Sequence, residues 1–122
     1  MTLAQYNAFC ASLPHATNVV QWGDASVWKI GGKVFAIGGW NAGPALAVTF
    51  KCSALSFDIL KTQPGLRPAP YLASRGFLWI QRTDASAMSD ASLKDYLRRS
   101  RLLAAGGLPK KVRAALGIRA RA

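Results

Sequence analysis

Basic side chains are the residues of this 122-residue chain whose type and spacing suggest chemistry. Lys94, Arg98 and Arg101 recur at i, i+4 and i+7, which places them on one stripe if the segment is helical. Two lysines and an arginine follow within a dozen residues: Lys110, Lys111 and Arg113. Ammonium and guanidinium groups bind phosphate oxygens, so the pattern indicates a polyanionic partner. The alternative is a solvated helix face, although such a face usually mixes both signs of charge.

The charge of the chain is concentrated at its C-terminal end. Residues 94–122 hold nine basic residues and one acid, a net charge of +8, whereas residues 1–93 hold seven and four, a net charge of +3. All five acids are aspartates. Because so basic a segment repels itself, we expect a polyanion nearby, most often nucleic acid and less often an anionic membrane surface.

Catalytic chemistry has little support in the sequence. The only histidine, His15, follows Pro14 in a predicted loop, and no serine or cysteine has a local signature that links it to a base. Asp24 follows Trp22-Gly23 and is predicted to lie in a turn. The remaining enzymatic hypothesis places a pocket carboxylate in this Trp22–Asp24 region. We expect a non-enzymatic protein.

Metal, cofactor and membrane sites are also not indicated. Cys10 and Cys52 form no CxxC pair and have no histidine at metal-ligand spacing, so we expect reduced, buried thiols and neither a metal nor a cofactor. Gly31-Gly32-Lys33 precedes a valine and not Ser or Thr, which excludes a Walker-type phosphate loop. Without a run of 18 apolar residues or a secretory signal, the expectation is a cytoplasmic protein, monomeric, with no membrane span.

Helical and strand periodicities predict the elements that position the basic residues. A first helix is expected over residues 3–12, with Thr2 and Gln5 at capping-box spacing. Gly31-Gly32 predicts a two-residue hairpin. One face of this hairpin should carry Lys29 and Val34, and the other should carry four apolar residues with Lys33 at the rim: Trp28, Ile30, Phe35 and Ile37.

The later segments complete an α+β pattern. A half-buried strand over 45–51 precedes a helix over about 54–62, capped by Ser53. The inward-facing candidates of this helix are Leu55, Ile59, Phe57 and Leu60. Residues 67–73 should be irregular, and 76–82 should form another strand. A long helix follows to about residue 105, with Ser89 or Asp90 as its cap and Leu103 in its buried stripe. A last short helix is expected after Pro109, with Val112 and Leu116 as its apolar contacts. These elements predict a two-layer α+β domain, an antiparallel β-sheet with helices packed on one face.

Three motifs in this order resemble a known family. They are Trp22-Gly23-Asp24 followed by Lys29-Ile30-Gly31-Gly32-Lys33-Val34-Phe35-Ala36; Pro64-Gly65-Leu66-Arg67-Pro68-Ala69-Pro70-Tyr71-Leu72; and Ser100 with Leu108-Pro109-Lys110-Lys111. Over residues 1–117 the chain resembles the MmcQ/YjbR family, which leaves 118–122 as a basic tail. His15 stands where the family usually has glycine and Asn18 where it has an acid, so the loop before the first strand is less typical.

The resemblance implies a CyaY-like fold and a non-enzymatic DNA-binding protein with a double wing of β-hairpins. The wing candidates here are the hairpin at Gly31-Gly32 and the loop around Trp40. Iron binding, known from frataxins with the same fold, needs a ridge of acidic oxygen ligands. A chain with no glutamate and five scattered aspartates does not supply that ridge.

The leading hypothesis is therefore a small domain that binds double-stranded DNA mainly through phosphates, with low sequence specificity. The candidate contact residues are Lys29, Lys33, Lys94, Arg98, Arg101, Lys110, Lys111 and Arg113. Asn41 and Arg67 are candidates for base contacts. Neutralising about five phosphates predicts a slope of log K against log salt of roughly −4.5. The alternative is an interaction module that binds an acidic protein or small anionic ligand on the sheet face near Trp22, Trp40 and Tyr71.

Overall fold

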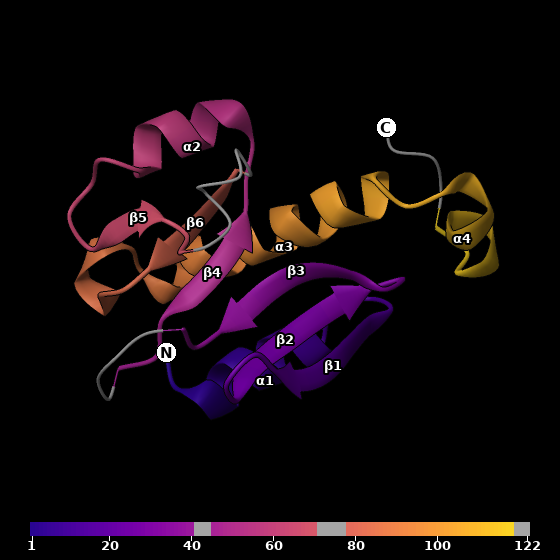
Figure 1. Cartoon of the computed structure of the whole chain (residues 1–122), viewed down its shortest axis with the longest axis horizontal. Coiled ribbons are helices and arrows are strands. Elements are labelled where there is room, and N and C mark those ends of the chain that lie inside the picture. The colour runs from indigo at the N-terminus through magenta and orange to yellow at the C-terminus, as the bar shows by residue number, and fades with distance from the viewer. Residues whose placement is uncertain (41–44, 71–77, 119–122) are drawn as a thin grey trace.

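A six-stranded antiparallel sheet forms the centre of the protein in its computed structural model, which describes residues 1–40, 45–70 and 78–118 (Figure 1). The strand order is β1-β2-β3-β4-β6-β5. The strands are β1 (Ala16–Gln21), β2 (Ala25–Ile30), β3 (Lys33–Gly38), β4 (Val48–Lys51), β5 (Leu66–Pro68) and β6 (Trp79–Arg82). The helices are α1 (Leu3–Ala11), α2 (Ala54–Leu60), the 3-10 turn η2 (Ala85–Ala87), α3 (Asp90–Gly106) and α4 (Lys110–Ala115). The predicted two-layer α+β class is confirmed.

Helices α1 and α3 cover one face of the sheet and close the main core. Tyr6 and Cys10 of α1 and Leu93 and Leu97 of α3 are fully buried in one apolar cluster with strand residues such as Phe50. The predicted caps are present: Thr2 and Gln5 form the capping box of α1, and serines cap α2 and α3. Capping thus fixes where the covering helices begin, as the sequence indicates.

The β2–β3 hairpin turns at Gly31-Gly32, as predicted, and both glycines have positive φ. Ile30 pairs with Lys33, but a bulge places Trp28 opposite Ala36. The expected position of Ile37 is therefore wrong: it lies on the opposite face with Val27 in a second, smaller cluster. An extra residue in one strand reverses the facing of every residue beyond it, and the period-two pattern alone does not locate it.

Two expectations about burial are also wrong. Strand β4 is buried on both faces, since Thr49 is as inaccessible as its neighbours Val48 and Phe50. Helix α2 turns two of its predicted inward residues outward, since Leu55 is 72% and Ile59 53% exposed, whereas Phe57 packs against the main core as expected. Leu60 is the buried residue of α2. The short helix therefore anchors through one end and leaves an apolar side to solvent.

The segment predicted to be irregular contains a short edge strand, β5, which pairs with β6 through Leu66 and Arg82. Pro68 ends it, consistent with proline at an edge position.

Leu103 of α3, expected inside, is 40% exposed. At the other end of the chain, Val112 of α4 and its C-cap residue Leu116 pack against the main core, as expected.

Ser100 of α3 joins the sheet to its covering helix. The β3–β4 ladder ends at the pair of Ala36 and Phe50. One residue further along, the buried Ser100 hydroxyl donates to Phe35 O at 2.6 Å and accepts the Lys51 N–H at 2.8 Å. The side chain therefore occupies the place of the next inter-strand hydrogen bond and satisfies both backbone groups where β3 and β4 separate.

Candidate nucleic-acid interface

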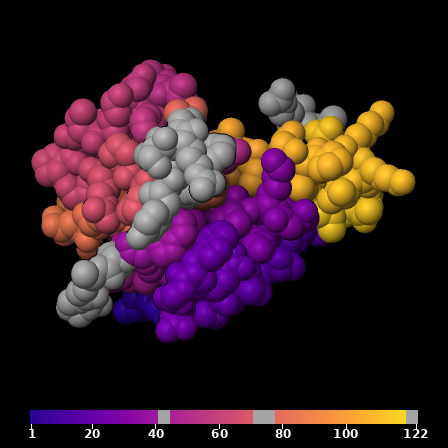
Figure 2. Space-filling model, viewed as in Figure 1, coloured from indigo at the N-terminus to yellow at the C-terminus, as the bar shows by residue number. Residues whose placement is uncertain are grey.

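The tip of the β2–β3 hairpin packs against the segment that joins α3 to α4. A Cβ atom placed on Gly31 would lie 2.8 Å from Leu108 Cδ1 and 3.2 Å from Val112 Cγ1. Such distances show that the turn and the C-terminal segment are in direct contact, and that only glycine fits there without a shift. Figure 2 shows the C-terminal residues, in yellow, against the purple strands at one end of the molecule. The predicted wing is therefore docked onto α4.

Lys33 reaches across this contact. Its Nζ lies so close to Gly107, the C-cap of α3, that a Cβ on that glycine would be 3.1 Å away. The negative end of a helix dipole attracts an ammonium group there, which gives Lys33 a structural role as well. Helix α4 begins beside it and carries three more cations, of which two are exposed and one is half-buried. We call Lys33, Lys110, Lys111 and Arg113 the basic end.

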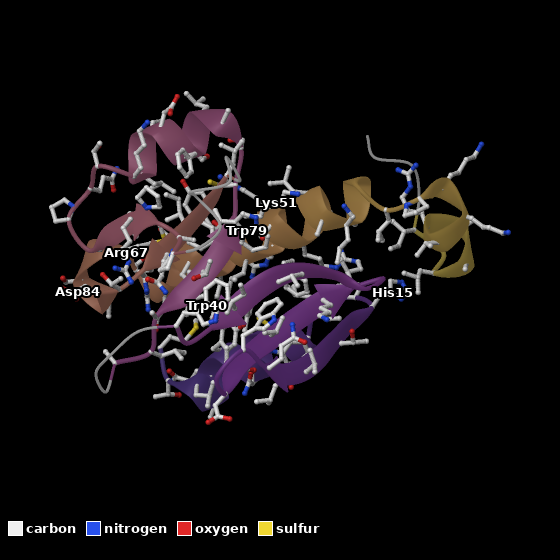
Figure 3. All side chains as sticks on the ribbon, viewed as in Figure 1. His15, Trp40, Lys51, Arg67, Trp79 and Asp84 are labelled. Atoms are coloured by element: carbon white, nitrogen blue, oxygen red, sulfur yellow. The ribbon has the colours of Figure 1, made fainter. Side chains whose placement is uncertain are left out.

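The described aspartates lie away from the basic end. Asp24 occupies the β1–β2 turn, the length of a strand away from Gly31, and Asp58 is in α2. Asp84 precedes η2, and Figure 3 places it at the opposite end of the molecule from His15, which lies beside the hairpin tip. The ion pairs among the described residues involve Asp58, Asp90 and Asp95, and none of them includes a cation of the basic end. The positive charge of the basic end is therefore not compensated by a described carboxylate.

Two of the predicted cations on α3 lie over an aromatic ring of α1. Lys94 Nζ is 5.6 Å and the Arg98 guanidinium 5.1 Å from the centre of the Phe9 ring. Arg98 also pairs with Asp95 at 2.7 Å. The predicted stripe exists, but its members help to hold α1 against α3, and an adjacent carboxylate offsets part of its charge.

Arg101 is engaged in the same way. Its Nε donates to Pro14 O at 2.8 Å, which ties α3 to the turn between α1 and β1. Burial lowers the pKa of Arg101, because desolvation disfavours the charged form. Arg101 therefore serves mainly to join these elements, whereas Lys110 and Lys111 further along the chain are exposed.

Lys29 is separated from the other predicted contacts. In the sheet it stands opposite Thr17 of β1 and Val34 of β3. Its side chain lies on the face of the sheet opposite the helices. The eight predicted cations thus divide into the basic end, the α1–α3 side and this outer sheet face. The apolar contact between Gly31 and Leu108 brings Lys33 of the hairpin to the cations of α4 and was not predicted. The Leu108-Pro109-Lys110-Lys111 motif was the available signal.

A second polar arrangement lies on the outer face around two tryptophans. The rings of Trp22 and Trp40 are 5.6 Å apart, and both residues have positive φ. Gln81 donates to the carbonyl oxygens of Gly39 and Trp40, and its own oxygen accepts the Nε–H of Arg67 at 2.8 Å. The predicted base-contact residue Asn41 and the sheet-face residue Tyr71 lie outside the described residues.

Other kinds of site find no support in the described part of the chain. Both cysteines are free and buried, as predicted, and burial raises the pKa of Cys10 to about 12 and that of Cys52 to about 11. No group of three potential metal ligands occurs among residues 1–40, 45–70 and 78–118. Within the same ranges, none of the helices has the length and apolar character needed to cross a membrane. Asp24 lies in an exposed turn, as expected.

Comparison with known proteins identifies the family. The family model described as YjbR matches residues 11–103. The chain belongs to the YjbR family. The resemblance to this family is thereby confirmed, and the matched range includes the first two motifs, Ser100, both outer tryptophans and most of α3. Leu108-Pro109-Lys110-Lys111 of the third motif lies beyond it. Residues 104–122, which include α4 and about two thirds of the basic segment, extend beyond the match.

The fold of this YjbR-family protein also occurs in a solved structure. The crystal structure of Deinococcus radiodurans protein DR2400, a DUF419 domain, superposes with a TM-score of 0.81 at 21% sequence identity. The match covers 99% of this chain and 91% of that one. No curated protein matches the sequence. At this identity the likeness establishes the shared architecture.

Proposed function

We propose that this protein is a non-enzymatic domain that binds double-stranded DNA through its basic end, mainly by contacts to phosphates. The supporting observation is the docking of the β2–β3 hairpin on the start of α4, which gathers cations from distant parts of the sequence on a surface far from the described aspartates. Phosphate contacts fix position and affinity without reading sequence, so specificity should be low. Lys94 and Arg98 lie on the separate α1–α3 side, where they contact the Phe9 ring.

Salt dependence provides the quantitative test. If the four cations of the basic end each neutralise one phosphate, log K should fall against log salt with a slope of roughly −3.6. Replacing Lys110, Lys111 and Arg113 by alanine should reduce the slope to roughly −0.9 and weaken binding at low salt by more than about tenfold. Fluorescence anisotropy of a labelled duplex over a series of salt concentrations measures both quantities.

A matched variant separates this surface from net charge. Figure 3 shows Lys51 of β4 and Arg67 of β5 away from α4, and Lys61 directly follows α2. Their triple replacement by alanine removes the same charge and should leave most of the affinity and the slope. Equal losses in the two triple variants would show that total charge and not the basic end controls binding. A parent protein that does not bind duplex DNA at low salt would refute the proposal.

A second candidate is an interaction module that holds an acidic protein or small anionic ligand on the outer sheet face. It is favoured by the Trp22–Trp40 pair beside Arg67, whose guanidinium is oriented by Gln81. Binding at this face should quench tryptophan fluorescence and should survive the α4 triple variant. If Arg67→Gln loses the quenching by the anionic ligand and Lys110→Ala still binds that ligand, the interaction module would be supported over DNA binding at the basic end.

A further inference from the structure

A hollow of about 500 Å³ lies between the start of α2 and the second half of α3. Its size falls within the usual range of small-molecule sites. The walls are mainly apolar, with a few polar groups, and include Ser53, Ser56, Tyr96, Arg99, Leu102 and Leu103. This surface was not predicted, because the sequence pattern places Leu103 inside the core.

The apolar wall is formed by side chains that the fold leaves open. Leu102 is 61% and Leu103 40% exposed, and Tyr96 is half-buried below them. The Tyr96 ring stacks on Phe50 with a centroid separation of 5.1 Å, so the floor of the hollow is fixed to the sheet. Covering two large leucines would remove apolar area from water and favour an apolar ligand.

Arg99 supplies a positioned positive charge at this wall. Its guanidinium lies 5.2 Å from the centre of the Tyr96 ring, and no carboxylate among the described residues forms an ion pair with it. On the α2 side, the Ser53 hydroxyl oxygen accepts the Ser56 N–H, which leaves its own O–H as a donor. One cation and a hydroxyl donor beside an apolar surface are complementary to a single carboxylate on an apolar body.

The geometry points to a binding site for a small apolar monocarboxylate, such as a medium-chain acyl or aryl acid. The carboxylate would pair with Arg99 and its tail would cover Leu102 and Leu103. A nucleotide or polyphosphate fits less well, because the lining contains one cation and is largely apolar. A second copy of the chain is disfavoured as the occupant, because each copy carries a net charge of +11.

Octanoate and its uncharged analogue 1-octanol test the proposal by calorimetric titration of the full chain. Octanoate should bind saturably at one site and more tightly than 1-octanol. Arg99→Gln should weaken the affinity for octanoate by about tenfold, because one charge-assisted contact is lost. The affinity for 1-octanol should not change. Leu102→Ser should weaken both ligands.

Arg98→Gln is the matched control, since it removes the same charge from the adjacent residue, which points to Phe9 on the other side of α3. It should leave octanoate binding unchanged. Equal weakening in the Arg98 and Arg99 variants, or equal affinity for octanoate and 1-octanol, would overturn the proposal. So would the failure of octanoate to bind while a glutamate-rich amphipathic peptide does bind, since that result would assign the hollow to a protein partner.

Discussion

Arg82 is a charged residue inside the apolar core, and its environment explains how α3 is attached to the sheet. Its side chain is 2% exposed and projects from β6 toward the helical layer. Nη1 donates to Met88 O at 2.7 Å and to Asp90 Oδ1 at 3.2 Å. A buried guanidinium is stable only when it is paired, so these contacts fix the first residue of α3 relative to β6.

Stability at acid pH should report this pairing. Burial alone would raise the pKa of Asp90, but hydrogen bonds from Arg82 and the Met1 α-amino group outweigh it and lower the pKa below the usual range. A lowered pKa in the folded state contributes stability above the pKa of the unfolded chain, and that contribution is lost as the pH falls through the folded value. Asp90→Asn should therefore be less stable at pH 7, and its stability should change less below about pH 4.

Urea unfolding of parent and Asp90→Asn at several pH values measures the effect. At pH 7 the loss should be about 1–3 kcal/mol, because the variant weakens one hydrogen bond to a buried charge. Asp84 also has a lowered pKa, caused by hydrogen bonds from Ser86, so some acid sensitivity should remain. Parallel pH curves for the two proteins would contradict the assignment.

At the scale of elements, the docked hairpin can be tested at its two glycines. Gly31 has φ +55 and lies against Leu108, whereas Gly32 has φ +85 with open space where a Cβ would be. Alanine at either position is strained by the positive φ, but only Gly31→Ala also clashes with the α4 segment. We expect Gly31→Ala to cost about 1–3 kcal/mol more than Gly32→Ala.

Thermal or urea unfolding of the two glycine variants gives this difference directly. Because both substitutions lie in one turn, Gly32→Ala controls for backbone strain. The Gly31 variant should also weaken DNA binding more, since it displaces α4 from Lys33. Equal stability of the two variants would show that the hairpin tip does not depend on its contact with Leu108.

Ser100 provides a second prediction at this scale. Ser100→Ala removes the hydroxyl that satisfies Phe35 O and Lys51 N, and both groups are then left in a buried position without a partner. The expected loss of stability is about 2–4 kcal/mol. Ser92→Ala, an exposed position on the same helix, should change stability little. Chemical denaturation of both variants makes the comparison, and a small loss for Ser100→Ala would contradict the bridging role.

Helix ends and the hairpin turn were predictable because local chemistry determines them. Thr2, Ser53 and Ser89 each cap a helix, and Gly31-Gly32 adopts the positive φ that its turn requires. Tertiary features were not predictable in this way. The bulge that turns Ile37 to the other face, and the outward stripe of α2, depend on neighbours that the local pattern does not contain.

For the whole molecule, the sequence predicted which cations to consider but not how they are grouped. Lys94, Arg98 and Arg101 share a helical stripe as expected, yet each contacts another part of the protein. Lys33 and α4, which are more than 70 residues apart in the chain, meet because an apolar contact joins them. Charge spacing describes one helix face, whereas such a meeting depends on the complete fold.

The uncompensated charge of the basic end predicts an effect of salt on stability. Like charges close together destabilise the folded state, and dissolved salt screens them over about 10 Å at 0.1 M. Raising sodium chloride from low to moderate concentration should therefore increase the melting temperature. The Lys110, Lys111, Arg113→Ala variant should lose most of this increase, whereas the Lys51, Lys61, Arg67→Ala variant should retain it. Calorimetry of the three proteins measures the difference.

The position of the Ser100 hydroxyl has a consequence for the motion of the protein. The Lys51 amide hydrogen is protected by a side chain of α3, while its neighbours in β4 are protected by adjacent strands. Detachment of α3 would expose this amide to solvent deuterium while the sheet stays paired. Lys51 should therefore exchange faster than Phe50, and its rate would report how often the helical layer lifts from an intact sheet.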